Sequence, residues 1–297
     1  MGQFTKTESV FYSKNTRCVG DLYLPKAVDK PPIVIMAHGF GAERCFGLPD
    51  YAEKFAGNGI AVYLFDYRCF GESDGAPRNL VDPKRHLQDW SAAIQHVRSL
   101  NNIDTSRIAL WGSSFSGGHV IVTAAKDPRI SAIIAQVPFV NAISTTLKLG
   151  PAFLIRATPH GIRDLCRVFT FRPPHYVKII GKPDEFALMN TPECYDGYLA
   201  LIPENTKWEN GCPARILLKF AAYRPIAHAK RVQCPALVMM GEYDSLIDAA
   251  DVEKTANKMP NAQLVKYPIG HFDIYKGNAF ENAIQKQTEF LLTHLAS

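Results

Sequence analysis

Short, continuous, mostly apolar runs recur along this chain, and each has the length of a single β-strand. Many of their residues are β-branched, which is typical of strands buried on both faces of a parallel sheet. The runs lie at residues 33–37, 60–65, 107–111, 132–137, 236–240 and 263–267. Because a membrane-spanning helix needs roughly 20 apolar residues, the sequence also predicts that the chain does not insert into a membrane.

Between these runs, apolar residues recur every three or four positions, as on one face of a helix. The clearest case is 83–100, where Asp82 can cap the first turn and Pro83 suits the first helical position. Another helix is predicted at 279–295. Strands that alternate with helices predict an α/β fold with a mostly parallel, doubly wound sheet. The first 25 residues alternate instead, which predicts an antiparallel hairpin.

The alternation of strands and helices is interrupted once, by about 90 residues that are rich in proline and aromatic residues. A compact domain rarely contains so long a connection unless the connection is functional. We therefore predict that residues 142–231, hereafter the insert, form a largely helical cap, and that residues 1–141 and 232–297 form the core. The chain's net charge of +5 belongs to the insert, which has 13 Lys and Arg against 7 Asp and Glu.

Composition excludes several classes of protein. With 47% hydrophobic and 21% charged residues, the chain has an ordinary globular composition, and no run of like charges indicates nucleic-acid binding. The N-terminus lacks the apolar core of a signal peptide, and the seven cysteines contain no CxxC pair, which predicts free thiols in the cytoplasm. No metal-ligand spacing or dinucleotide fingerprint is present, so we expect no metal ion and no other cofactor. A homodimer is compatible with the sequence.

The segment 111–118 follows a predicted strand and precedes a helix predicted at 119–126. Its G-S-S-F-S-G-G sequence places Ser114 at the centre of a nucleophile elbow, a sharp turn that exposes a serine between strand and helix. The usual motif has glycine two residues after the nucleophile, where this chain has Ser116, which is also small. Ser113 and Ser116 are the alternative nucleophiles, and a phosphate-binding turn is the non-catalytic alternative.

A serine hydroxyl needs a base, and histidine can take up a proton and return it near neutral pH. His271 lies between the last predicted strand and the last helix, at the same edge of the sheet as Ser114. Asp244 follows the preceding strand and is the carboxylate that we expect to orient the imidazole. The alternative acids are Glu242, Asp248 and Asp251. The histidines that we expect to be structural or solvated are His38, His86, His96, His119, His160, His175, His228 and His294.

Acyl transfer also requires hydrogen-bond donors for the negative oxygen that develops during the reaction. The backbone N–H of Phe115 is one candidate, because it opens the helix after the nucleophile. The backbone N–H of Phe40 is the other, because it follows the His-Gly turn after the first parallel strand. We expect His38 to brace this loop and to transfer no proton.

Together these motifs resemble those of the α/β-hydrolase superfamily. The similarity covers nearly the whole chain outside the insert: residues 38–41, 66–75, the elbow, residues 241–244 and the Gly270-His271 pair. The order serine, acid, histidine is the order found in these enzymes. The elbow is similar to that of a subgroup near the dienelactone hydrolases and X-prolyl peptidases, which includes fungal polyketide acyltransferases. The resemblance implies the α/β-hydrolase fold and a structural role for residues 66–75.

We therefore expect a serine hydrolase that cleaves carboxylic esters or thioesters of a small-molecule acyl substrate through an acyl-enzyme. An acyltransferase that passes the acyl group to an alcohol or amine uses the same triad and stays open as an alternative. A peptidase of the X-prolyl type is disfavoured because such enzymes carry additional large domains. The intact triad disfavours a non-catalytic binding protein. We expect most aromatic residues of the insert to form its own core.

Overall fold

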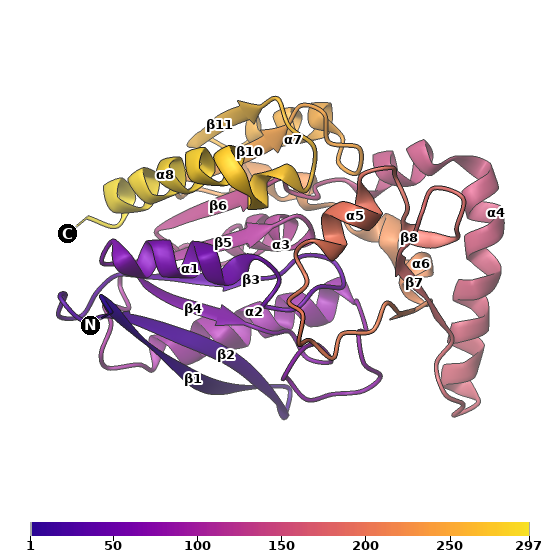
Figure 1. The fold of residues 1–297 in the computed structure, drawn as a ribbon, viewed down its shortest axis with the longest axis horizontal. Coiled ribbons are helices and arrows are strands. Elements are labelled where there is room, and N and C mark those ends of the chain that lie inside the picture. The colour runs from indigo at the N-terminus through magenta and orange to yellow at the C-terminus, as the bar shows by residue number, and fades with distance from the viewer. Residues whose placement is uncertain (1, 297) are drawn as a thin grey trace.

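Eight strands form the central sheet of the computed structural model, which describes residues 2–296 (Figure 1). Their spatial order is β1-β2-β4-β3-β5-β6-β10-β11. The strands are β1 (Phe4–Ser13), β2 (Thr16–Pro25), β3 (Ile33–Ala37), β4 (Ala61–Phe65), β5 (Ile108–Ser113), β6 (Ala132–Gln136), β10 (Ala236–Gly241) and β11 (Ala262–Tyr267). The first two strands form the predicted hairpin, β2 is also antiparallel to β4, and the other neighbours are parallel. The predicted, mostly parallel α/β sheet is confirmed.

Helices cover both faces of this sheet because strand side chains alternate between the two faces. On β3, for example, Ile35 packs into the core on one side and Met36 into the core on the other. One face carries α1 (Leu48–Gly57) and α8 (Gly277–His294), and the other carries α2 (Pro83–Arg98), α3 (Phe115–Ala124) and α7 (Ala249–Ala256). Asp82 caps α2 as predicted. No helix in the described part of the chain has both the length and the apolar character to cross a membrane.

The insert begins with a long helix, which runs along the side of the molecule away from the central sheet (Figure 1). Gly150, with φ 75°, kinks this helix just before a proline. The insert also contains a small sheet in the order β8-β7-β9, which the sequence analysis did not predict. The elements are α4 (Ala142–Phe169), β7 (Tyr176–Ile180), β8 (Ala187–Met189), α5 (Cys194–Leu199), β9 (Cys212–Pro213), α6 (Ile216–Lys219), η1 (Phe220–Ala222), η2 (Pro225–Ala227) and η3 (Ala229–Arg231). A further 3-10 turn, η4 (Asp273–Tyr275), precedes α8.

Candidate active site

Ser114 occupies the tight turn between β5 and α3, with φ 56° and ψ −120°, angles that residues other than glycine rarely adopt. The turn requires Gly112, because a Cβ atom there would lie 2.3 Å from the backbone oxygen of Ser116. Ser116 stands where the usual motif has glycine, and its buried hydroxyl shares a 2.9 Å hydrogen bond with the Tyr67 hydroxyl. The predicted helix start at residue 119 is wrong, because α3 begins at Phe115.

His271 lies between Ser114 and Asp244, so the structure brings the three predicted residues together. Its Nε2 is 3.0 Å from the Ser114 Oγ, and its Nδ1 is 2.6 Å from an Asp244 carboxylate oxygen. Because the carboxylate can only accept, Nδ1 carries the proton and Nε2 accepts from the serine hydroxyl. The other Asp244 oxygen accepts the backbone N–H groups of Leu246 and Ile247, each at 2.8 Å. These contacts fix the orientation of this candidate triad.

The three alternative acids occupy other positions. Asp248 caps α7 by accepting two backbone N–H groups. Asp251 accepts a 3.1 Å hydrogen bond from the Asn141 side chain, and Glu242 is exposed. Within residues 2–296, none of these three carboxylates hydrogen-bonds to the His271 imidazole. The geometry therefore favours Asp244 as the residue that orients this ring.

The loop of residues 38–42, hereafter the oxyanion loop, passes directly over the nucleophile. A Cβ atom on Gly39 would lie 3.1 Å from the Ser114 Cβ, a tight contact, so the close approach favours glycine. The rings of Phe40 and Phe115 also meet, with centroids 5.3 Å apart. In the described residues, neither of these two backbone N–H groups donates to a protein acceptor. Two unpaired donors beside a serine are what an oxyanion requires.

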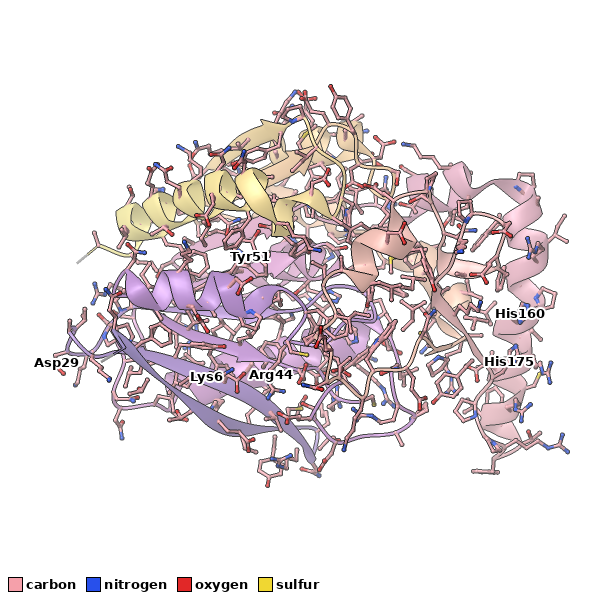
Figure 2. All side chains as sticks on the ribbon, in the orientation of Figure 1. Lys6, Asp29, Arg44, Tyr51, His160 and His175 are labelled. Carbon is pink, nitrogen blue, oxygen red and sulfur yellow. The ribbon has the colours of Figure 1, made fainter. Side chains whose placement is uncertain are left out.

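Buried charges brace the oxyanion loop from behind. The His38 imidazole is almost fully buried and lies 3.6 Å from an Asp66 carboxylate oxygen. Asp66 accepts the backbone N–H of Arg44 at 2.7 Å and forms an ion pair with the guanidinium of Arg44, which is labelled in Figure 2. Burial lowers the pKa of His38 to about 4, so the imidazole is neutral near pH 7. These positions fit the structural roles predicted for His38 and for residues 66–75.

Two further pairs of histidines lie outside the candidate triad. His86 and His119 are buried against each other at 3.2 Å, and His119 also hydrogen-bonds to the Tyr223 hydroxyl. His160 and His175 stack in the insert, with facing ring nitrogens 2.7 Å apart (Figure 2). Both pairs also pack on aromatic rings, His86 on Tyr67 and His160 on Phe186, and the buried Nε2 of His86 has no hydrogen-bond partner among the described residues. Among the described residues, no three His, Cys, Asp or Glu side chains are grouped so that they could hold a metal ion.

A cavity of about 210 Å³ opens beside Ser114 and is roofed by the insert. Its lining residues are Phe40, Ser114, Phe115, Phe139, Thr145, Lys148, Leu149, Phe153, Leu188, Met189, Asn190, Thr191, Ile216, Leu217, Phe220, Ser245, Leu246 and Ile247. Most of these side chains are apolar. Of the insert's aromatic residues, Phe153 and Phe220 line the cavity. The expectation that most of them form the insert's own core is wrong, because several are exposed (Phe169, Phe171 and Tyr176) and others pack against residues of the core (Tyr198, Phe220 and Tyr223). A second cavity, of about 30 Å³, lies beside His271.

Two sets of residues that hold the site together escaped the sequence analysis. Ser113 hydrogen-bonds beneath the elbow to Tyr275 at 2.5 Å and to Gln136 at 3.1 Å. Glu193 of the insert accepts the backbone N–H of His271 at 3.0 Å. Ser113 belongs to the elbow motif, but its partners Tyr275 and Gln136, like Glu193, belong to no recognisable motif, and each contact joins residues that are distant in the sequence. No signal in the sequence identifies them.

Comparison with known proteins identifies a family and several relatives. A family model described as serine aminopeptidase, S33 (Hydrolase_4), matches residues 29–272. The quorum-quenching protein AidA of Acinetobacter baumannii (strain MDR-ZJ06) is 38% identical over 281 residues, which are 95% of this chain and 92% of AidA. The polyketide transferase af380 of Aspergillus fumigatus is 24% identical over 272 residues, which cover 89% of this chain and 90% of that protein.

The fold is also that of solved α/β hydrolases. The crystal structure of the α/β hydrolase GrgF from Penicillium sp. sh18 superimposes with a TM-score of 0.83 and 23% identity. The superposition covers 99% of this chain and 100% of GrgF. The resemblance that the sequence motifs indicated is therefore confirmed. The chain belongs to the serine aminopeptidase S33 (Hydrolase_4) family of α/β hydrolases.

Proposed function

We propose that this protein is a serine hydrolase that cleaves carboxylic esters or thioesters through an acyl-enzyme. The observation that carries the proposal is the hydrogen-bonded chain from Ser114 through His271 to Asp244, at 3.0 Å and 2.6 Å. This arrangement activates a hydroxyl for attack, because the base contacts the serine and a buried carboxylate contacts the base. The apolar cavity beside it supplies a place for an acyl group.

The reaction follows from the positions of these groups. As the Ser114 Oγ attacks the substrate carbonyl carbon, its proton passes to the His271 Nε2, and Asp244 stabilises the resulting imidazolium. The negative carbonyl oxygen is held by the N–H groups of Phe40 and Phe115. When the intermediate collapses, the alcohol or thiol leaves with the proton from His271. A water molecule, deprotonated by His271, then attacks the acyl-enzyme and releases the acid and the free serine.

The shape and charge of the cavity favour an apolar acyl group. Its volume of about 210 Å³ exceeds the roughly 150 Å³ of an engineered apolar cavity that holds benzene. The family description names an aminopeptidase, which must bind a positively charged amino group. The described residues that line the cavity include no carboxylate that could pair with such a group, and the one charged lining residue, Lys148, is itself paired with Asp248 at 2.5 Å. We therefore place ester or thioester cleavage ahead of peptide cleavage.

An acyltransferase remains the second candidate, because the polyketide transferase af380 is similar over most of this chain. The acyl-enzyme would be the same, with an alcohol or amine in place of water. The insert covers the cavity, and a covered, water-poor site favours transfer over hydrolysis. The two functions are separated by adding small alcohols and amines to an ester substrate. Formation of the free acid alone supports the hydrolase, whereas an acylated acceptor formed at millimolar acceptor concentration supports the transferase.

A fluorophosphonate is the direct test of the proposed function, because it reacts with a serine that has been activated by a base. We expect one phosphonate adduct, on Ser114, when the labelled protein is digested and its peptides are analysed by mass spectrometry. The adduct should be absent from protein unfolded in urea, and should persist in a Ser116→Ala variant. A folded protein that takes up no label, or takes it up on Ser113 or Ser116, would contradict the assignment.

The length of the acyl group should depend on Phe220, whose ring packs against Phe139 with centroids 4.9 Å apart. A Phe220→Ala variant lengthens the cavity, so kcat/KM for long acyl esters should rise relative to that for butyrate esters. Room for two further methylenes corresponds to about 1.5 kcal/mol, or roughly a tenfold change in the ratio. The ratio is measured with p-nitrophenyl esters of increasing acyl length. Phe169→Ala, which removes an exposed ring outside the cavity, is the control and should leave the ratio unchanged.

A further inference from the structure

One carboxylate of the insert contacts both loops that carry the candidate triad's acid and base. We name residues 242–248 the acid loop and residues 268–273 the histidine loop. Glu193, which directly precedes α5, accepts the backbone N–H of His271 at 3.0 Å through one oxygen. Its other oxygen accepts the backbone N–H of Ser245 at 2.9 Å and the Ser245 hydroxyl. The side chain therefore bridges the residue after Asp244 and the peptide group of His271.

The fit between the insert and the histidine loop is close. A Cβ atom on Gly270 would lie 2.2 Å from a Glu193 carboxylate oxygen, so any larger residue at this position would push the carboxylate out of its observed place. On α5, a Cβ atom on Gly197 would lie 2.7 Å from the Phe272 ring. Two successive parts of the insert thus approach the histidine loop so closely that no side chain fits between them.

The acid loop is held by the insert in the same way. The Ser245 hydroxyl hydrogen-bonds to Thr191 at 2.6 Å as well as to Glu193. The two loops are joined directly by the hydrogen bond between Asp244 and His271, at 2.6 Å, and by the backbone contact from the Tyr243 N–H to the Ile269 oxygen, at 3.1 Å. Glu193 adds a connection immediately beside the functional side chains, where the distance between carboxylate and imidazole is set.

We propose that Glu193 is a positioning residue, which holds the acid loop and the histidine loop at the separation that the triad requires. This inference rests on the proposed function of the triad. Hydrogen bonds from N–H groups to a carboxylate are stronger than those between neutral groups, so the bridge resists separation of the loops. Because Glu193 belongs to the insert, the geometry of the triad then depends on how the insert is seated on the core. The insert contributes to the chemical step as well as to the cavity.

The decisive variant is Glu193→Gln, which preserves the size of the side chain. Glutamine has a single acceptor oxygen, so it can accept the backbone N–H of one loop but not of both. If its NH₂ group faces the acid loop, it can donate only to the Ser245 hydroxyl and leaves the Ser245 N–H without an acceptor, which weakens the bridge. Misplacement of a catalytic group by about 1 Å can lower the rate roughly 100-fold. We expect kcat to fall about 10- to 100-fold while KM stays within twofold, because Glu193 does not line the cavity.

Glu185→Gln is the matched control. Glu185 is also a carboxylate of the insert, where it accepts the Lys182 backbone N–H at 3.0 Å and pairs with Lys178 at 2.7 Å. It contacts neither loop in the described structure. If both variants lose a similar amount of unfolding free energy but only Glu193→Gln loses kcat, the effect is on positioning. Equal kcat in Glu193→Gln and wild type would overturn the inference, as would a loss found entirely in KM.

A second measurement does not depend on activity. The proton between the His271 Nδ1 and Asp244, which are 2.6 Å apart, should give a far-downfield proton resonance in the wild type. The resonance should move or broaden in Glu193→Gln and stay in place in Glu185→Gln; an unchanged resonance in Glu193→Gln would overturn the inference. If the wild type is not labelled by a fluorophosphonate, the proposed function fails, and this resonance still decides the role of Glu193. If Glu193→Gln does not fold, Glu193→Asp, which is too short to reach both loops, is used with the same expectations.

Discussion

Replacing Ser114 with alanine is expected to lower kcat for an ester substrate by about 10⁶-fold while leaving the fold intact. Removal of the nucleophile from a comparable serine hydrolase has an effect of this size, and the remaining rate comes from binding and oxyanion stabilisation. The backbone strain at Ser114 is unchanged, because alanine has the same Cβ atom. The substitution removes one hydrogen bond, to His271, so the free energy of unfolding should change by about 1 kcal/mol or less.

The measurement compares kcat and urea unfolding of the purified variant with those of the wild type. Ser116→Ala is a useful control, because its hydroxyl is buried against Tyr67 and makes no contact with the imidazole. That variant should lose stability and keep most of its kcat. If the Ser114→Ala protein keeps more than about one per cent of the wild-type kcat, another residue carries the acyl group. A fall of only about 100-fold is far smaller than the fall found when a true nucleophile is removed.

The central sheet could be predicted because each of its buried strands is a short, continuous apolar run in the sequence. A strand such as β3 is buried on both faces, so every residue is apolar and the run is visible without any tertiary information. The helix after the nucleophile shows where this reasoning ends. All ten residues of α3 are buried, so it has no polar face and no period of 3.6, and it contains Gly117 and Gly118. Its start at Phe115 is set by the elbow and not by helix propensity.

The candidate site was predictable to the extent that it lies at strand ends. Ser114, Asp244 and His271 each follow a parallel strand, and the carboxyl ends of parallel strands meet at one edge of a sheet. The contributions of the insert were not predictable. Its small sheet has strands of five, three and two residues, which are too short for a pattern. Glu193 and Phe220 acquire their positions from tertiary contacts alone.

Acidification from pH 7 to pH 5 is expected to lower the free energy of unfolding by about 4 to 5 kcal/mol. The cause is three histidines that are almost fully buried around the elbow: His38 in the oxyanion loop, His86 on α2 and His119 on α3. Burial lowers the pKa of His38 to about 4, that of His119 to about 3, and that of His86 well below its usual value. His86 stacks on the Tyr67 ring, with centroids 4.1 Å apart, where a cation would be poorly solvated.

The direction follows from where each proton is bound. An unfolded histidine has a pKa near 6.5, so below that pH the unfolded chain takes up protons that the folded protein excludes. The contribution of these histidines to the free energy of unfolding is therefore fully present above pH 6.5, and it is lost as the pH falls toward their pKa values in the folded protein. At pH 5 each histidine contributes a loss of about 2 kcal/mol. Asp89 has the opposite effect on the free energy of unfolding. Burial raises its pKa to about 6, so at pH 5 the folded protein binds a proton that the unfolded chain does not, which offsets about 1 kcal/mol of the loss.

Urea unfolding at pH 7, 6 and 5 measures the effect. The slope of the free energy of unfolding against pH gives the number of protons taken up on unfolding. Near pH 5.5, unfolding should take up about two protons, because the three histidines bind protons and Asp89 releases one. Two protons correspond to a slope of about 2.7 kcal/mol per pH unit. His119→Gln should lower that number by about one. A slope near zero in the wild type would mean that the folded protein accepts these protons. The imidazoles behind the oxyanion loop would then be cations, and the neutral, aromatic packing that holds this loop over Ser114 would need another explanation.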